Sequence, residues 1–226
     1  MADRVTVAGW VGSTNLGDEL LFRVLRGLLA DRGMTVGTPS VDPAGTAAVH
    51  DVEAFGHLGS SALRRSLVAS DAFVFGPGGL LQDETGIWNL PYHLRRLGPV
   101  RRAGIPWAGI GLGADSLITD RGRSRVRRAL VGHTAIAVRD EPSAEALRAL
   151  GVDRVVRTAD LAFLVERPTV SRDGVLGVCL RAPQSGRLRP GALDAGRTWS
   201  DERAAALATA LDEACRATGL TTRFVA

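Results

Sequence analysis

The amino-acid sequence predicts an α/β fold with a Rossmann-like, mostly parallel sheet and helices on both of its faces. Two patterns lead to this expectation. Short apolar runs alternate along the chain with longer segments whose apolar residues recur at helical spacing. The apolar runs are continuous and show no polar alternation, which is typical of strands that are covered on both faces.

The predicted elements alternate between strand and helix. The expected strands are residues 5–9, 34–37, 72–75, 106–110, 135–138 and 161–164. The expected helices are residues 18–30, 60–70, 87–102, 121–131 and 143–150. Pro91 should lie near the first turn of the third helix or at a kink. Residues 49–55 give no clear signal.

A break in the alternation near residues 166–174 predicts a domain boundary, because proline, glycine and charged residues gather there. We expect a Rossmann-like domain over residues 1–168 and the beginning of a second α/β domain over residues 174–226. Because two strands form a poor independent core, the second domain is expected to be truncated or to pack on the first. Its expected elements are a strand at 175–181, a helix at 201–218 and a strand at 222–225.

The composition argues against several classes of chemistry. All 28 basic residues are arginine, so the chain carries neither the lysine of a Walker-type phosphate loop nor a Schiff-base lysine. Cys179 and Cys215 are too few for a disulfide scaffold. No apolar run approaches the roughly 20 residues that span a bilayer. We therefore expect a cytoplasmic protein, with the inner face of the membrane as an open second location.

Five arginines concentrate positive charge in one short stretch: Arg121, Arg123, Arg125, Arg127 and Arg128. One interpretation is a solvated helix face. The other is a surface for acidic glycans, lipid diphosphates or an anionic membrane, so peripheral membrane association stays open. No aromatic residue stands among these arginines, and nucleic-acid binding is therefore not expected.

Four loops follow the carboxyl ends of predicted strands: residues 10–19, 76–85, 111–116 and 139–143. In a parallel sheet these ends share one edge, so we expect the loops to line one cleft. Asp18 and Glu19 either favour a helix N-terminus through its dipole or bind sugar hydroxyls and the reacting centre. Gly78 and Gly79 allow the backbone to approach a ligand closely, although a tight turn is the alternative.

Arg139 is the strongest candidate for binding an anion, because its planar fork can hold a carboxylate or a phosphate through two hydrogen bonds. The alternative is an ion pair with Asp140, Glu141 or Asp160. Asp83 follows the glycine segment and is expected to be a polar group of the cleft.

The sequence gives little support for a cofactor site. The glycines of the first loop do not form the dinucleotide pattern G-x-G-x-x-G, so an NAD site is not expected. His50 and His57 lie close to Asp51 and Glu53, but their spacing fits no common metal site. We therefore expect neither a metal nor another cofactor.

Several segments, taken in order, resemble the polysaccharide pyruvyl transferase family. Residues 9–19 resemble its G-x-x-G-x-x-N-x-G-D-E loop, and residues 71–83 are similar to its D-x-x-x-x-G-G-G-x-L-x-Q-D segment, with Pro77 in place of the middle glycine. Gly109 and Gly113 stand where that family usually has Gln and Pro. The remaining similar segments are residues 104–113, 138–143, 158–163 and 177–181.

This resemblance implies a two-domain fold like that of GT-B glycosyltransferases. It implies transfer of a pyruvyl group from phosphoenolpyruvate to a sugar of a cell-surface or secreted glycan, usually as a cyclic ketal. The acceptor would be a sugar, a nucleotide sugar or a lipid-linked saccharide. The family's catalytic histidine and further basic residues would lie beyond residue 226, so this piece alone is expected to be inactive. The oligomeric state stays open.

The resemblance and the loop residues together give the expected site. Arg139 would hold the negative charge of the donor, and the acidic residues would bind sugar hydroxyls or transfer protons. The predicted catalytic residues are Asp18 and Glu19. The predicted substrate-binding residues are Asn15, Gly17, Gly78, Gly79, Asp83, Arg139 and Ser143.

Two other functions stay open, because a fold by itself does not define an activity. A GT-B-type glycosyltransferase would use a nucleotide sugar and release a nucleoside diphosphate rather than inorganic phosphate. A non-catalytic carbohydrate-binding protein with half of an enzyme fold would bind a glycan without consuming phosphoenolpyruvate.

Overall fold

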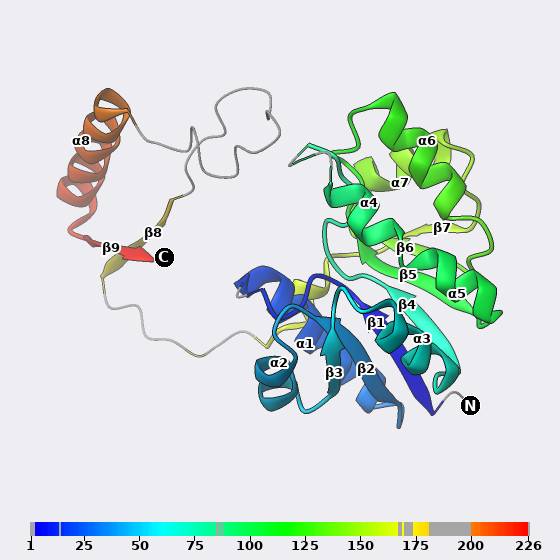
Figure 1. Ribbon diagram of the computed structural model, residues 1–226. Helices are drawn as coiled ribbons and strands as arrows, with labels where there is room; N and C mark the ends of the chain where they lie inside the picture. The colour runs from blue at the N-terminus through cyan, green and yellow to red at the C-terminus, as the bar shows by residue number, and fades with distance from the viewer. Residues whose placement is uncertain are drawn as a thin grey trace. The chain divides into compact units, whose positions relative to one another are not determined.

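The computed structural model describes residues 3–13, 15–84, 86, 88–166, 169, 174–180 and 200–225. The chain forms two compact units, residues 1–166 and 167–226 (Figure 1). The break in sequence pattern had suggested a boundary within residues 166–174. The first unit contains the large sheet and the second a short two-stranded one.

The first unit is built on a seven-stranded sheet whose strands all run parallel, in the order β3-β2-β1-β4-β5-β6-β7 (Figure 1). This confirms the predicted α/β class with a parallel sheet. The chain order reverses between β1 and β4, and such a switch point opens a crevice at the carboxyl ends of the strands. The strands are β1 Arg4–Ala8, β2 Thr35–Ser40, β3 Glu53–Gly56, β4 Ala72–Phe75, β5 Trp107–Leu112, β6 Ile136–Val138 and β7 Val155–Arg157.

Helices cover both faces of this sheet, which is why its strands are apolar on both sides. On one face Phe22 and Leu25 of the first helix pack on Val5, Val7 and neighbouring strand residues. On the other face a larger cluster joins the sheet to the third to seventh helices. The helices are α1 Leu16–Ala30, α2 Pro43–His50, α3 Ser60–Val68, α4 Asn89–Leu94, α5 Leu97–Ala103, α6 Asp120–Ala129 and α7 Glu141–Ala149.

The single helix predicted over residues 87–102 is wrong, because two helices, α4 and α5, occupy this segment. Pro91 lies in the first turn of α4, as expected. Pro99 explains the break: its ring has no N–H for the carbonyl of Arg95 and clashes with that carbonyl in a continuous helix. The interruption leaves Arg95 and Arg96 between the helices.

The last predicted strand of this unit, residues 161–164, is also wrong. Leu161–Leu164 forms a 3₁₀ helix, η1, because the side chain of Asp160 accepts a hydrogen bond from the backbone nitrogen of Ala162. The last strand is β7, which had no prediction. The unclear residues 49–55 contain the end of α2 and most of β3, and β5 extends to Leu112 rather than ending at residue 110.

The second unit has a β-α-β order. Its strands β8, Val175–Cys179, and β9, Thr221–Val225, pair in parallel. Helix α8, Asp201–Thr218, has the bounds that its apolar spacing predicted. The predicted extension of the first strand to residue 181 falls partly outside the described residues. Within the part of the chain that the structure describes, no helix is both long and apolar enough to cross a membrane.

Candidate functional site

The loops after β1, β4 and β5 touch one another at the switch point. The backbone nitrogen of Gly78 donates to the Gly111 carbonyl at 3.0 Å, and the nitrogen of Gly113 donates to the Gly78 carbonyl at 3.1 Å. A Cβ atom at Gly9 would lie 3.3 Å from the carbonyl oxygens of Gly76 and Pro77. Three of the four predicted loops therefore meet at the carboxyl edge of the sheet.

Asp18 lies in the first turn of α1 and faces the glycine segment that follows β4. Its Oδ1 atom is 2.9 Å from the place where a Cβ of Gly78 would be, so only glycine fits there without displacing the carboxyl group. Burial, reinforced by the charge of Glu19, raises the pKa of Asp18 to about 6, and the charge of Arg139 opposes the rise. The carboxyl group therefore exchanges its proton near pH 6 and is able both to donate and to accept one.

Asn15 and Glu19 hold the loop that precedes Asp18. The side-chain oxygen of Asn15 accepts hydrogen bonds from the backbone nitrogens of Gly17, at 3.0 Å, and Asp18, at 3.4 Å. This is the N-cap of α1. Glu19 accepts a hydrogen bond from the backbone nitrogen of Gly12 at 2.7 Å through Oε1, and its Oε2 lies 2.7 Å from Nε2 of His50. Both carboxylate oxygens of Glu19 thus have protein partners.

Arg139 follows β6 and lies against Gly113, where a Cβ would be 3.1 Å from its Nε and Nη2 atoms. It forms the ion pairs that were the alternative to anion binding, with Asp140 at 3.4 Å and Asp160 at 3.5 Å. These pairs are long, and 32% of the Arg139 side chain is exposed. Because such pairs contribute only about 0–1 kcal/mol, an anionic ligand can compete for the guanidinium group.

Asp140 and Ser143 fix the turn into α7. The Ser143 hydroxyl is fully buried and accepts a hydrogen bond from the backbone nitrogen of Ala114 at 2.8 Å, while its own nitrogen donates to Asp140 at 2.8 Å. Burial of Asp140 favours its neutral form, but the hydrogen bonds from Ser143 and the charge of Arg139 outweigh it and lower the pKa of Asp140. Ser143 thereby joins the turn into α7 to the loop that follows β5.

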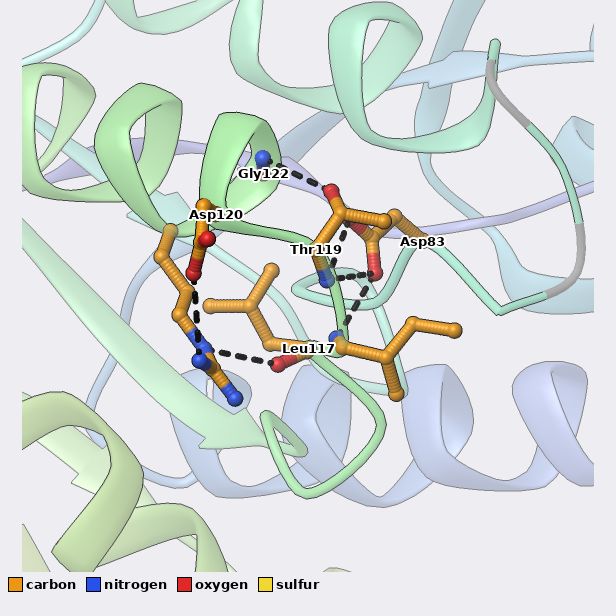
Figure 2. Close-up of polar contacts among 7 residues, drawn as sticks. Asp83, Leu117, Thr119, Asp120 and Gly122 are labelled. Carbon is orange, nitrogen blue, oxygen red and sulfur yellow. Dashed lines mark hydrogen bonds and ion pairs between the residues drawn. The ribbon is translucent and has the colours of Figure 1, made fainter.

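Asp83 organises the loop before α6 (Figure 2). Its carboxylate accepts hydrogen bonds from the backbone nitrogens of Ile118, at 2.8 Å, and Thr119, and from the Thr119 hydroxyl. The Thr119 oxygen in turn accepts from the nitrogen of Gly122 and caps α6. Among the described residues no hydrogen bond or ion pair joins Asp83 to Asp18 or Arg139, whereas the charge of Arg139 acts on the pKa of Asp18.

Asp83 also borders a cavity of about 410 Å³ between α4 and α6, which Trp88, Leu90 and Arg125 line as well. Gly79, by contrast, has no atom within 4 Å of its Cβ position, so its backbone is open to a ligand. In the described part of the chain, no group of three or more His, Cys, Asp or Glu side chains is arranged to hold a metal ion.

Two contacts of this region had no signal in the sequence. His50, considered above as a metal ligand, instead faces Glu19 and stacks edge-on against Phe22. Arg96, within the segment predicted as one helix, is buried and donates a hydrogen bond to the Gly9 carbonyl at 3.3 Å. Both contacts join residues far apart in sequence, so local spacing does not reveal them.

Comparison with known families gives a match over much of the chain. The model of the family "Polysaccharide pyruvyl transferase" matches residues 15–190, which is more than half of the chain. The chain belongs to the polysaccharide pyruvyl transferase family. The match confirms the resemblance seen in the sequence, and it spans all of the predicted site residues, from Asn15 to Ser143.

Among solved structures, the chain is similar to the hypothetical protein SMU.573 from Streptococcus mutans. The two have 12% sequence identity and a TM-score of 0.41, and the alignment covers 70% of this chain and 59% of that chain. The present chain thus spans less than two thirds of the length of the Streptococcus mutans protein. No curated protein matches the chain.

Proposed function

We propose that this protein transfers a pyruvyl group from phosphoenolpyruvate to a sugar of a cell-surface or secreted glycan and forms a ketal. Membership of the polysaccharide pyruvyl transferase family supports the reaction class. The observation that carries the assignment to a site is the placement of Asp18, a carboxyl group of raised pKa, against Gly78 and of Arg139 against Gly113, two glycines whose backbones are hydrogen-bonded at the carboxyl edge of the sheet.

The donor suits these two side chains. Phosphoenolpyruvate carries a carboxylate and a phosphate, and a guanidinium fork binds either through two hydrogen bonds. Arg139 is already oriented by Gly113 and by two long ion pairs, which a ligand of higher charge can replace. The open backbone at Gly79 and the absence of a side chain at Gly78 leave room for the donor beside Asp18.

In the proposed reaction Asp18 acts first as a general acid. The π electrons of the enol form a C–H bond with its proton at the methylene carbon, and the adjacent carbon becomes electrophilic. A sugar hydroxyl oxygen then bonds to that carbon and gives up its proton, for which the Asp18 carboxylate is the acceptor. Phosphate leaves with the electrons of its C–O bond, a second sugar hydroxyl attacks the same carbon, and loss of its proton closes the ketal.

The other predicted residues take positioning roles in this proposal. Glu19, predicted as a second catalytic residue, holds the loop after β1 through Gly12 and His50, and Asn15 caps the helix that carries Asp18. Asp83 and Ser143 hold the loop between β5 and α6 from its two ends. We also assign the β8-α8-β9 segment to a second α/β domain of a GT-B-like fold, which its parallel pairing supports.

The experiment is incubation of the protein, at its full natural length, with phosphoenolpyruvate and a panel of sugar, nucleotide-sugar and lipid-linked acceptors. Inorganic phosphate release and the methyl signal of the ketal in ¹H NMR are the two readouts. Asp18→Asn should reduce both about 100-fold or more while leaving a measurable residual rate, whereas Asp31→Asn, at the exposed far end of the same helix, should leave them unchanged. Release of a nucleoside diphosphate from a nucleotide sugar, with phosphoenolpyruvate intact, would overturn the proposal in favour of a glycosyltransferase.

A further inference from the structure

Helices α3 and α5 pack together on one face of the sheet (Figure 1). A second polar cavity is lined by residues of these two helices. Its volume is about 250 Å³, slightly below the range of about 300–1,000 Å³ for the pockets of drug-sized ligands, and suits a small ion or group. We call it the arginine pocket, because four arginines line it: Arg64, Arg95, Arg96 and Arg102. None of Asp18, Gly78 or Arg139 lines it, and neither an aspartate nor a glutamate is among its lining residues.

The positive charge of the arginine pocket is uncompensated. Within the described ranges, none of its four arginines lies within ion-pair distance of a carboxylate, and Arg64 and Arg102 have no hydrogen-bond acceptor. Uncompensated charge of one sign in a concave site attracts ligands of the opposite sign. This arrangement differs from that of Arg139, which has two aspartates within ion-pair distance.

Arg96 gives the pocket a buried and fixed positive charge. Only 2% of this residue is exposed. Its Nη1 donates to the Gly9 carbonyl and its Nη2 donates to the Tyr92 hydroxyl at 2.8 Å, while its Nε, buried too, has no partner among the described residues. Burial lowers the pKa of Arg96 to about 10, so the side chain stays charged at neutral pH.

The pKa values of two neighbouring histidines reflect the positive charge of these arginines. The pKa of His57, which lines the pocket, is lowered by burial and by the charges of Arg96 and Arg95. The pKa of His93 is lowered to about 3 by the same causes. Both imidazoles are therefore neutral near pH 7, and the arginines supply the positive charge.

The N-terminus of α3 also faces this cavity. Gly59 and Ser60 line it, and Gly59 at the N-cap offers no side-chain acceptor to the first amides of the helix. Such amides, together with the helix dipole, favour a negatively charged ligand. Donors from α3, from the break between α4 and α5, and from α5 thus surround one small space.

We propose that the arginine pocket is a binding site for a phosphate group, separate from the Asp18–Arg139 site. A phosphate presents more acceptor oxygens and more charge than a carboxylate, and donors on several sides suit a tetrahedral anion. Two sources share this chemistry: free inorganic phosphate, and the diphosphate of a phosphorylated sugar or carrier. The inference does not depend on the proposed function, because it requires no reaction.

The test is calorimetric titration of the chain with inorganic phosphate and with pyrophosphate at low ionic strength. Arg64→Gln should weaken binding about tenfold, and Arg64→Gln with Arg102→Gln should weaken it further, since each lost charge-assisted hydrogen bond accounts for about one order of magnitude. Arg65→Gln is the matched control, because this exposed arginine lies on the same helix and does not line the pocket. Its affinity should stay within about twofold of the wild type.

A second readout needs no variant. A phosphate in the pocket should raise the pKa of His57, because it offsets the charges of Arg95 and Arg96. Titration followed by NMR should therefore move the His57 ring signals more than those of His133, which lies between α6 and β6 in the chain and does not line the pocket. Tighter binding of pyrophosphate than of phosphate would identify a diphosphate group as the ligand, and the reverse order would identify the free anion.

Three results would overturn the inference: no binding of either anion, equal weakening by Arg64→Gln and Arg65→Gln, or binding that leaves the His57 signals unchanged. Catalytic activity enters none of these readouts. Failure of the phosphate site and failure of the proposed pyruvyl transfer are therefore distinguishable.

Discussion

The Asp18–Arg139 site and the arginine pocket lie in the same unit, but they differ in whether carboxylates accompany their arginines. Arg139 has two carboxylate neighbours, whereas the arginines of the pocket have none among the described residues. A site with mixed charges can orient a ligand and move a proton, because its carboxyl groups respond to the ligand. A site with charge of one sign attracts and holds an anion but has no carboxyl group to donate a proton.

The two regions also differ in what shapes them. Backbone contacts between glycine-bearing loops build the Asp18–Arg139 site, and a side chain at several of these positions has no space. Long side chains from helices build the arginine pocket. We therefore expect backbone substitutions to disrupt the first region strongly, and charge substitutions to alter the second with little change in stability, except at buried Arg96.

The largest expected effect is that of Gly12→Ala in the loop after β1. Gly12 has φ +77°, and a Cβ there would overlap the Ser40 hydroxyl and lie 2.7 Å from the backbone nitrogen of Asp42. Gly33 has nearly the same φ, +73°, but has open space around it. Urea denaturation should show a loss of about 3 kcal/mol or more for Gly12→Ala and about 1 kcal/mol for Gly33→Ala. Equal losses for the two variants would mean that the residues around Gly12 move aside for a methyl group at little cost in stability.

Arg96→Met should reduce the free energy of unfolding by about 1–3 kcal/mol, because it leaves the buried Gly9 carbonyl without its donor and removes a hydrogen bond from Tyr92. Arg64→Met, at the exposed side of the same pocket, should change it by no more than about 0.5 kcal/mol. The same urea denaturation measures both. A large loss for Arg64→Met would show that the pocket serves folding rather than binding.

Arg139→Lys should raise the KM for phosphoenolpyruvate about tenfold, because an ammonium group cannot form the two parallel hydrogen bonds of a guanidinium group. Arg148→Lys is the control, since Arg148 forms an exposed ion pair with Glu141 outside the proposed site. It should alter KM by less than about twofold. An unchanged KM in Arg139→Lys would remove this residue from the donor site.

A further expected effect concerns stability as a function of pH. The pKa of Asp18 is higher in the folded chain, at about 6, than its ordinary value of 3.8, so the folded state binds the proton more tightly. The contribution of Asp18 to stability is therefore greatest below pH 3.8 and decreases as the pH rises through about 6. Asp18→Asn should flatten this decline in urea denaturation between pH 4 and 7, and Asp31→Asn should not.

Local sequence signals predicted the parts of the fold that depend on local patterns. The apolar run Ala72–Phe75 and the amphipathic segment Asp201–Thr218 have the predicted type and bounds. The break at Arg95 and Arg96 was missed because Pro99 lies within a helical pattern and acts four residues upstream. The 3₁₀ helix at Leu161–Leu164 was missed because its apolar run reads equally well as a strand.

The candidate site was predictable as a set of loops but not as a set of contacts. The predicted strand ends and glycines put Asp18 and Arg139 at the same edge of the sheet. In the structure the charge of Arg139 acts on the pKa of Asp18. The pairing of Glu19 with Gly12 and His50 depends on how α1 and α2 pack. The arginine pocket gathers residues from three separate segments, which no local spacing reveals.

The most direct test of the account is the pH dependence of kcat/KM for phosphoenolpyruvate-dependent phosphate release, measured for the wild type and Asp18→Asn. The donor's own phosphate ionises with a pKa of about 6, but this ionisation cancels in the ratio of the two proteins. If Asp18 is the general acid, the ratio of wild-type to Asp18→Asn activity should fall as the pH rises through about 6. A ratio that is independent of pH would contradict the assignment of the proton to Asp18.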